Sequence, residues 1–200
     1  MTLYVRQAVT AVLAIVVFTV LVGVVYPFAV WAVGRVAASG QAAGSYVTDA
    51  NGAVVGSSLI GQNFGAGQNF GGTQWFQGRP SAAGTGYDAM NSGASNLSAS
   101  NPTLLTQVQQ RKAAIAKQDG VDPSEVPADA LTASGSGLDP DISPAYAAIQ
   151  VDRVAKARGL SVAQVQALVA ANTEGRALGF IGQPRVNVLL LNLALAAAAR

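Results

Sequence analysis

The feature that most constrains this 200-residue chain is an apolar segment near its amino terminus, running from Ala8 to Val33. No charged residue lies between Gln7 and Gly34. A helix of this length covers roughly 39 Å, which exceeds the ~30 Å hydrocarbon core of a bilayer. The sequence therefore predicts a transmembrane signal-anchor helix over residues 1–37 and one compact soluble domain over residues 38–200.

The alternative interpretation of this segment is a cleavable signal peptide, with "VAASG" at 36–40 as a weak cleavage site. The apolar run is about twice as long as a normal signal-peptide core, which favours an uncleaved anchor. Tyr26 and Trp31 suit a membrane–water interface, and Pro27 predicts a kink or the point where the helix leaves the membrane. The short leading segment with Arg6 predicts an inside amino terminus and residues 37–200 outside the cytoplasm.

Composition removes several classes of chemistry. The chain has no Cys and no His, which excludes cysteine nucleophiles, disulfides, CxxC sites and His-dependent serine triads. The net charge is +2 and no basic stripe is present, so no nucleic-acid partner is expected. We also expect no metal site.

The pattern after the anchor predicts a mixed α/β (α+β) domain with its helices mainly in the second half. Asn51-Gly52 predicts a turn before one or two short strands in 53–64. Capping residues predict three helices in the second half: one from Asn101-Pro102 to Asp119-Gly120, one from Ser143-Pro144 to Gly159, and one with a Ser161/Gln164 capping box reaching about Asn172. The sequence "VNVLLLNLALAAAAR" at 186–200 predicts a terminal helix with a wide apolar face. Residues 121–143 are expected to form a loop with a short helical turn, and the charges of the helices to serve capping and solvation.

A glycine-rich tract, "GQNFGAGQNFGG" at 61–72, repeats one hexapeptide. Gly65, Gly67 and Gly71 are spaced one residue too widely for a dinucleotide-binding fingerprint, and no Lys follows a Gly as a Walker A loop requires. The tract therefore predicts a surface loop.

Six segments together resemble one known family: "SLIGQNF" (58–64), "WFQGRPS" (75–81), "SGASNLSASNP" (92–102), "LTASGSGLDPDIS" (131–143), "QVDRVAKARGLS" (150–161) and "IGQPRVNVLLLNLAL" (181–195). In this order they are similar to the C subunit of Kdp-type potassium-transporting P-type ATPases. The resemblance covers nearly the whole chain. It also explains the tract at 61–72, because Phe64 and Phe76 lie about six residues farther apart than in the family pattern. We expect this duplication to be tolerated in a surface loop, since loop-closure entropy grows only logarithmically with length.

The resemblance implies a non-catalytic accessory subunit of a high-affinity potassium uptake complex in the bacterial cytoplasmic membrane. The implied partners are the P-type ATPase pump subunit, a potassium-channel-like subunit and membrane lipid. The implied roles are to stabilise assembly and to act as a catalytic chaperone that raises the ATP affinity of the pump. ATP with Mg would be used by the complex, and no cofactor is expected to bind this chain firmly.

The motif residues are expected to serve structural or partner-contact roles, and none is expected to be catalytic. They are Gln62, Asn63, Phe64, Arg79, Pro80, Ser81, Ser95, Asn96, Ser134, Gly135, Ser136, Gly137, Asp139, Ser143, Gln150, Arg153, Arg158, Gln183, Pro184 and Asn187. Arg79 is a candidate to anchor a carboxylate of the fold, while Asp139 and Asp141 could form a turn or line a cation path. Ala94 stands where the family usually has Gly, so a positive φ there would strain the backbone.

Two other function classes remain open from the residues alone. One is a membrane-anchored extracytoplasmic hydrolase, although the chain has neither an S-x-x-K pattern nor a G-x-S-x-G elbow. The other is a free-standing anchored binding module. The subunit interpretation requires co-isolation with multispanning partners, whereas the other two permit a functional lone protein.

Overall fold

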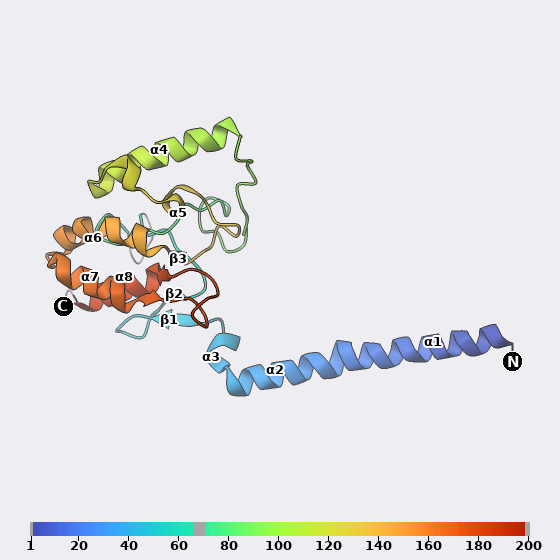
Figure 1. The fold of residues 1–200 in the computed structure, drawn as a ribbon. Helices are drawn as coiled ribbons and strands as arrows, with labels where there is room; N and C mark the ends of the chain where they lie inside the picture. Colours follow the sequence, from blue (N-terminus) through green and yellow to red (C-terminus); the bar gives the residue numbers. More distant parts are fainter. Residues whose placement is uncertain (1, 66–70, 199–200) are drawn as a thin grey trace. The chain divides into compact units, whose positions relative to one another are not determined.

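The computed structural model describes residues 2–65 and 71–198 of the chain. The chain divides into two compact units, Met1–Ser45 and Tyr46–Arg200. Figure 1 shows the first as a single helical rod and the second as a mixture of helices and short strands, with most helices in the second half of the sequence. The predicted α+β fold class is confirmed.

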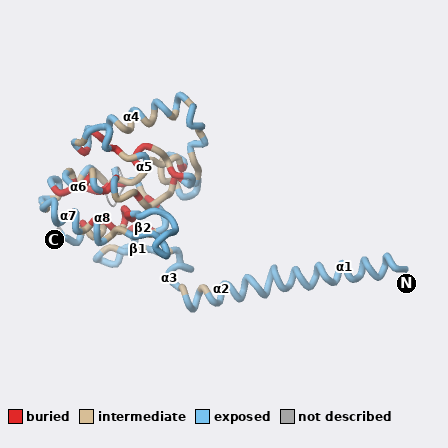
Figure 2. The backbone as a smooth tube through the Cα atoms, in the orientation of Figure 1, coloured by how far each residue is buried: buried red, intermediate tan, exposed pale blue. Residues whose placement is uncertain are grey.

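The first unit is a helix that is exposed on all sides. Its parts are α1 (Leu3–Val20), the π-helical turn η1 (Leu21–Val25) and α2 (Tyr26–Ala37), followed by the single turn α3 (Ser39–Ala42). Every residue from Thr2 to Val33 is exposed, as the pale blue tube in Figure 2 shows. The helix is long and apolar enough to cross a membrane. A helix that is apolar all round fits a lipid environment.

Pro27 does not end this helix, because α2 continues to Ala37. Proline lacks the N–H that would bond to the carbonyl four residues earlier. The chain forms the π-helical turn Leu21–Val25 directly before it, which is a common local adjustment of a helix. The disturbance predicted at Pro27 therefore takes the form of a π-turn within a continuous helix.

The second unit begins with a β-hairpin made of β1 (Tyr46–Thr48) and β2 (Val54–Ser57). The carboxylate of Asp49 accepts hydrogen bonds from the N–H groups of Asn51 and Ala53, both at 2.9 Å, and closes the turn. The turn and the strand after it were predicted, and both are confirmed. The first strand was not predicted.

Three helices begin and end where the sequence predicted. They are α4 (Pro102–Asp119), α6 (Pro144–Arg158) and α7 (Val162–Ala171). Their first turns are capped by the side chains of Asn101, Ser143 and Ser161. Gly120 and Gly159 follow α4 and α6 in the left-handed conformation that favours glycine.

The segment between α4 and α6 holds more structure than the predicted loop. It contains the short helices η2 (Pro123–Glu125) and α5 (Ala128–Leu131) and the strand β3 (Asp141–Ile142). The terminal helix was predicted to start at 186, which is wrong by two residues. Residues Arg185–Asn187 form β5, the central strand of a sheet in the order β3-β5-β4, and α8 covers Val188–Ala198. The edge strand β4 is Thr173–Glu174, and both pairings are antiparallel.

The core lies where α6, α7 and α8 pack together beside this sheet, and Figure 2 shows that buried segments extend from there to α5 and the end of α4. Val154, Val165 and Leu195 are fully buried and come from these three helices. Phe64 and Phe76 join the same core from the loops before α4. The long irregular segment before α4 is therefore tied into the domain by two aromatic side chains.

Two sequence expectations concern this irregular segment. Residues 66–70 of the duplicated tract lie outside the described residues. The backbone strain considered for Ala94 does not arise, because the non-glycine residues with positive φ in the described ranges are Ser45, Tyr87, Asn96 and Leu178. Asn96 has a φ of 51°, and asparagine tolerates this conformation better than most residues.

Candidate functional site

The segment "WFQGRPS" at 75–81 is the point where the other motifs meet. Its backbone runs beside α6 and α8 and forms hydrogen bonds to amide side chains from both helices. Asn192 of α8 accepts from the N–H of Phe76 at 2.9 Å and donates to its carbonyl at 3.0 Å. Because Asn192 and Phe76 are fully buried, these bonds are made without competition from water.

Gln150 of α6 makes the same kind of contact one residue later. Its Oε1 accepts from the N–H of Gln77 at 2.7 Å, and its Nε2 donates to the Gln77 carbonyl at 3.1 Å. Gln150 is fully buried, and its Nε2 also donates to the carbonyl of Tyr146 at 3.3 Å. Two buried amides thus satisfy the backbone of two successive residues, which fixes the position of this segment on the core.

Arg153, one turn after Gln150 on α6, also contacts this segment. Its guanidinium forms an ion pair with Asp119 at the end of α4 (2.5 Å) and donates to the carbonyls of Thr73 and Trp75, the latter at 3.0 Å. Nη2 of Arg153 also donates to Oε1 of Gln150 at 2.7 Å. Burial raises the pKa of the Asp119 carboxyl, and the hydrogen bond and charge of Arg153 lower it in part. The expectation that this arginine serves capping and solvation is therefore wrong.

Arg158 lies in the last turn of α6, where a cation suits the helix dipole. Its guanidinium carbon lies 4.2 Å from the centre of the Trp75 ring, within cation–π range. Together Gln150, Arg153 and Arg158 place one face of α6 against the segment from Thr73 to Gln77. The sequence predicted that these residues matter, but not that they share one partner.

Arg79 and Asp139 form an ion pair of 2.8 Å across 60 residues of sequence. Oδ1 of Asp139 also accepts from the N–H of Asp141 at 3.0 Å, so this carboxylate both closes a turn and holds Arg79. The predicted carboxylate anchor for Arg79 and the predicted turn role of Asp139 are both confirmed. The pair is about one quarter exposed, which leaves it open to solvent.

Two open hollows share the Arg79–Asp139 pair in their walls. One has a volume of about 610 Å³ and is lined mainly by the loop carrying Ser134, Gly135 and Ser136. The other, of about 530 Å³, is lined by Arg79, Asp129, Asp139, Asp141, Ser143, Gln183, Pro184 and Arg185, among others. Arg185 pairs with Asp141 at 3.0 Å and with Glu174 at 2.5 Å. Burial raises the pKa of the Asp141 carboxyl, and the charge of Arg185 lowers it in part.

Ser81 organises the turn that follows Arg79 and Pro80. Its hydroxyl donates to the carbonyl of Gly137 at 2.6 Å and accepts from the N–H of Tyr87 at 2.7 Å. Gly137 has a φ of 68°, and a Cβ there would lie 2.6 Å from the backbone of both Ala83 and Gly93. Only glycine fits this crossing of three loops.

Tyr87 contacts the backbone of Arg79 in the same region. Its hydroxyl donates to the carbonyl of Arg79 at 2.6 Å. Burial and, to a lesser extent, the nearby Asp139 carboxylate raise the pKa of Tyr87 to about 12. The phenol thus serves as a neutral hydrogen-bond donor at physiological pH.

Four further motif residues form hydrogen bonds to other groups of the second unit. Gln62 donates to the carbonyl of Val55 at 2.7 Å, Asn63 accepts from the N–H of Gly65 at 3.1 Å, and Ser143 donates to Asp129 at 2.9 Å. Asn187 donates to the carbonyl of Ser58 at 2.8 Å and accepts from the N–H of Leu190, in the first turn of α8. Ser95 lies apart from these contacts, in the wall of a third hollow of about 500 Å³ beside Arg111.

Sequence reasoning missed several residues of this network, namely Gln77, Tyr87, Asp119 and Asn192. One signal could have found Asn192, because it is the single polar residue in the run "VLLLNLAL" at 188–195. A polar side chain within a buried run needs an internal partner. Which backbone it contacts depends on tertiary packing.

Comparison with known proteins shows the family to which the chain belongs. The family model described as "K+-transporting ATPase, c chain" matches residues 8–197. Among curated relatives, the potassium-transporting ATPase KdpC subunit of Kineococcus radiotolerans is 55% identical over 197 residues, covering 97% of this chain and 95% of the relative. The KdpC subunit of Caulobacter vibrioides is 53% identical over 179 residues, with 89% and 86% covered. That of Koribacter versatilis is 46% identical over 188 residues, with 94% and 93% covered.

The match extends from the apolar helix through all six motifs to α8. It includes the segment at 75–81 and the helices whose amides hold it. The chain therefore belongs to the KdpC family, the c chain of the K+-transporting ATPases.

Proposed function

We propose that this chain is a non-catalytic accessory subunit that stabilises the assembly of a potassium-uptake ATPase in the bacterial cytoplasmic membrane. Its partners in this proposal are the pump subunit that hydrolyses ATP and the channel-like subunit that selects potassium. The apolar helix Leu3–Ala37 anchors the chain beside the spans of these partners. The compact second unit then serves as a rigid body held against them.

The observation that carries this proposal is that polar side chains of α6 and α8 form their hydrogen bonds and ion pairs within the fold. Gln150 and Asn192 hold the backbone of Phe76 and Gln77, and Arg153 is paired with Asp119. A catalytic group needs a free reactive atom within reach of a base or a substrate. Side chains whose hydrogen-bonding capacity is spent on backbone groups instead make a domain rigid, which is what a scaffold requires.

We further propose that the second unit lies outside the cytoplasm and affects ATP turnover only through the complex. A short leading segment carrying Arg6 supports an inside amino terminus. The chain then raises the ATP affinity of the pump without touching ATP or Mg. Coupling of this kind between distant sites typically amounts to 1–3 kcal/mol, which is enough for a fivefold to 150-fold change in affinity.

The test of this proposal uses single cysteines, because the natural chain has none. Ser124→Cys lies on an exposed turn of the second unit, and Thr2→Cys lies at the other end of the apolar helix. A membrane-impermeant thiol reagent is applied to cells with a permeabilised outer barrier. Labelling at 124 and not at 2 is the expected result, and Thr2→Cys should react only after the inner membrane is lysed.

The assembly and ATP roles are measured on the same preparations. Cells lacking this subunit should yield less intact complex, or a pump with weaker apparent ATP affinity, and a photoreactive ATP analogue should label the pump and not this chain. Labelling of Ser124→Cys only after lysis, or a nucleotide crosslink within residues 46–200, would restore a direct nucleotide role and defeat the proposal.

A further inference from the structure

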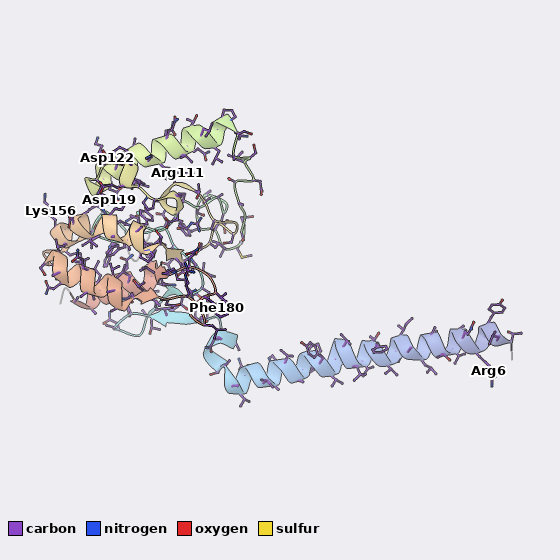
Figure 3. All side chains as sticks on the ribbon, viewed as in Figure 1. Arg6, Arg111, Asp119, Asp122, Lys156 and Phe180 are labelled. Carbon is purple, nitrogen blue, oxygen red and sulfur yellow. The ribbon has the colours of Figure 1, made fainter. Side chains whose placement is uncertain are left out.

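Among the described residues of the second unit, the loop before β5 carries the most exposed apolar cluster. Within four residues, Leu178 is 83% exposed, Phe180 71% and Ile181 52%. A single bridge between Ala177 and Ile181 closes the loop into a narrow tip. Figure 3 shows Phe180 at the margin of the unit, far from α4. Single exposed apolar residues are ordinary, but three of them on one tip mark a surface that meets something apolar.

The backbone holds this tip in an unfavourable conformation. Leu178 has a φ of 53°, and a leucine rarely adopts the left-handed region. Gly179, between Leu178 and Phe180, and Gly182, after Ile181, have φ values of 82° and 81°. The turn therefore directs large apolar side chains into solvent at a cost in conformational energy, and such strain clusters at functional positions.

The charges around the tip are suited to an anionic surface. Residues 175–184 contain no Asp or Glu, and Arg176 lies at the base of the loop. Arg176 donates only a weak hydrogen bond of 3.4 Å to Gln183 and forms no ion pair among the described residues. Arg185, on the other side, is occupied by Asp141 and Glu174. A cation without an ion pair next to exposed apolar side chains is attracted to anionic lipid headgroups, by about 1 kcal/mol for one basic residue near the surface.

Chain connectivity limits how far the second unit can move from the apolar helix. The residues between α2 and β1, Ala38–Ser45, could span at most about 28 Å even if fully extended, at ~3.5 Å per residue. If α1–α2 cross the membrane, the second unit cannot diffuse away from its surface. A lipid surface then always lies within reach of the second unit.

We propose that the tip Leu178–Ile181 inserts into the headgroup–acyl boundary of the bilayer, with Arg176 on the anionic headgroups. This contact gives the second unit a second attachment to the membrane in addition to the apolar helix. It limits the rotation of the unit about the linker. The inference rests on the proposed membrane anchor.

Spin labels at single cysteines test this in the full chain reconstituted into vesicles of phosphatidylcholine with phosphatidylglycerol. The sites are Phe180→Cys on the tip, Leu105→Cys as a matched exposed apolar position on α4, and Ile15→Cys within α1. Collisions with dissolved oxygen report lipid, and collisions with a water-soluble nickel complex report water. We expect the label at 180 to favour oxygen and the label at 105 to favour nickel. Arg176→Glu should lower the oxygen-to-nickel ratio at 180 severalfold in anionic vesicles and little in pure phosphatidylcholine.

The label at Ile15 separates the two hypotheses. If it reports lipid while the label at 180 reports water, the tip inference is wrong and the anchor stands. If the label at 15 also reports water, the anchor fails and the inference fails with it. A label at 180 that is shielded from both reagents, and only in the assembled complex, would identify a protein partner in place of lipid and also overturn the inference.

Discussion

Asn192 and Phe76 are joined by two reciprocal hydrogen bonds across 116 residues of sequence, with the amide of Asn192 accepting from and donating to the backbone of Phe76. Both residues are fully buried. Gln150 makes an equivalent pair of bonds to Gln77. The irregular segment at 75–81 is thus held like an extra strand, with amide side chains in place of a neighbouring strand's backbone. This explains how a domain with little sheet keeps a long irregular segment in one position.

We expect Asn192→Leu to lower the stability of the second unit by about 2–4 kcal/mol. Leucine leaves the N–H and the carbonyl of Phe76 buried without partners, and each such group costs about 1–3 kcal/mol. Thermal unfolding of the purified chain should show a Tm lower by roughly 5–15 °C.

Gln109→Leu is the matched control for that variant, since it makes the same kind of change at an exposed position of a helix. Its effect should stay within about 0.5 kcal/mol. If both variants unfold at the wild-type temperature, the hydrogen bonds to Phe76 are not a major source of stability.

The helices of the second unit were predictable because their ends are local. Asn101, Ser143 and Ser161 each bond to a backbone N–H two or three residues later, so the signal lies within one turn of chain. The apolar helix was predictable for a similar reason, since length and hydropathy suffice.

The short strands and the partners of the motif residues were not predictable in this way. β3 and β4 have two residues each, too few for an alternating pattern. Arg153 carries no mark in the sequence that distinguishes it from Lys156, yet it is buried against Asp119 and two loop carbonyls while Lys156 is exposed. Such pairings depend on tertiary packing.

Breaking the Arg153–Asp119 ion pair should make the free energy of unfolding depend more strongly on pH. In Arg153→Met the Asp119 carboxyl loses the partner that partly offsets the effect of burial, so its pKa rises further above 3.8 than in the wild type. The folded state then binds this proton more tightly than the unfolded state. The free energy of unfolding therefore falls as pH rises above the ordinary carboxyl pKa.

Urea unfolding at two pH values checks this. The loss in Arg153→Met should be about 3–5 kcal/mol at pH 7.5 and clearly smaller at pH 4.5. The double variant Arg153→Met/Asp119→Asn has no carboxyl to titrate and should lose the same stability at both pH values. Lys117→Met, an exposed change on α4, should have little effect at either. An equal loss at both pH values in the single variant would show that Asp119 is not the titrating group.

Tyr87 should contribute to the loss of stability of the second unit at alkaline pH. Its pKa is raised to about 12 from 10, mainly by burial, so the folded state retains the phenol proton longer than the unfolded state. Its contribution to stability is present below pH 10 and is lost as pH rises toward 12. Tyr87→Phe should lose about 1 kcal/mol at pH 8, from the hydrogen bond to Arg79, and should then fall less steeply than wild type between pH 9 and 11. Tyr46→Phe, at an exposed position, is the control and should follow the wild-type slope.

The duplicated tract should be removable without loss of function, and the structure shows which six residues to remove. The N–H of Gly72 donates to the carbonyls of Phe64 and Gly65, both at 3.1 Å, so the two ends of the extra segment already lie side by side. Gly72 also accepts from the side chain of Gln77 at 3.1 Å, which ties it to the segment at 75–81. Removing residues 67–72 would discard these contacts. Removing residues 66–71 keeps Gly72 and the hydrogen bond that it accepts from Gln77, and a peptide bond to Gly65 takes the place of the two hydrogen bonds of its N–H.

We expect the variant lacking 66–71 to assemble with its partners and support potassium uptake as wild type does. Shortening a loop changes its closure entropy by less than about 1 kcal/mol, so the Tm should stay within a few degrees. Gly72→Ala in the full-length chain is the contrasting variant, because its φ of 109° and a Cβ only 2.4 Å from the Gln74 side chain predict a larger loss. Growth on limiting potassium and co-purification of the complex measure the outcome. Normal stability of the shortened chain together with failed assembly would mean that the tract contacts a partner subunit.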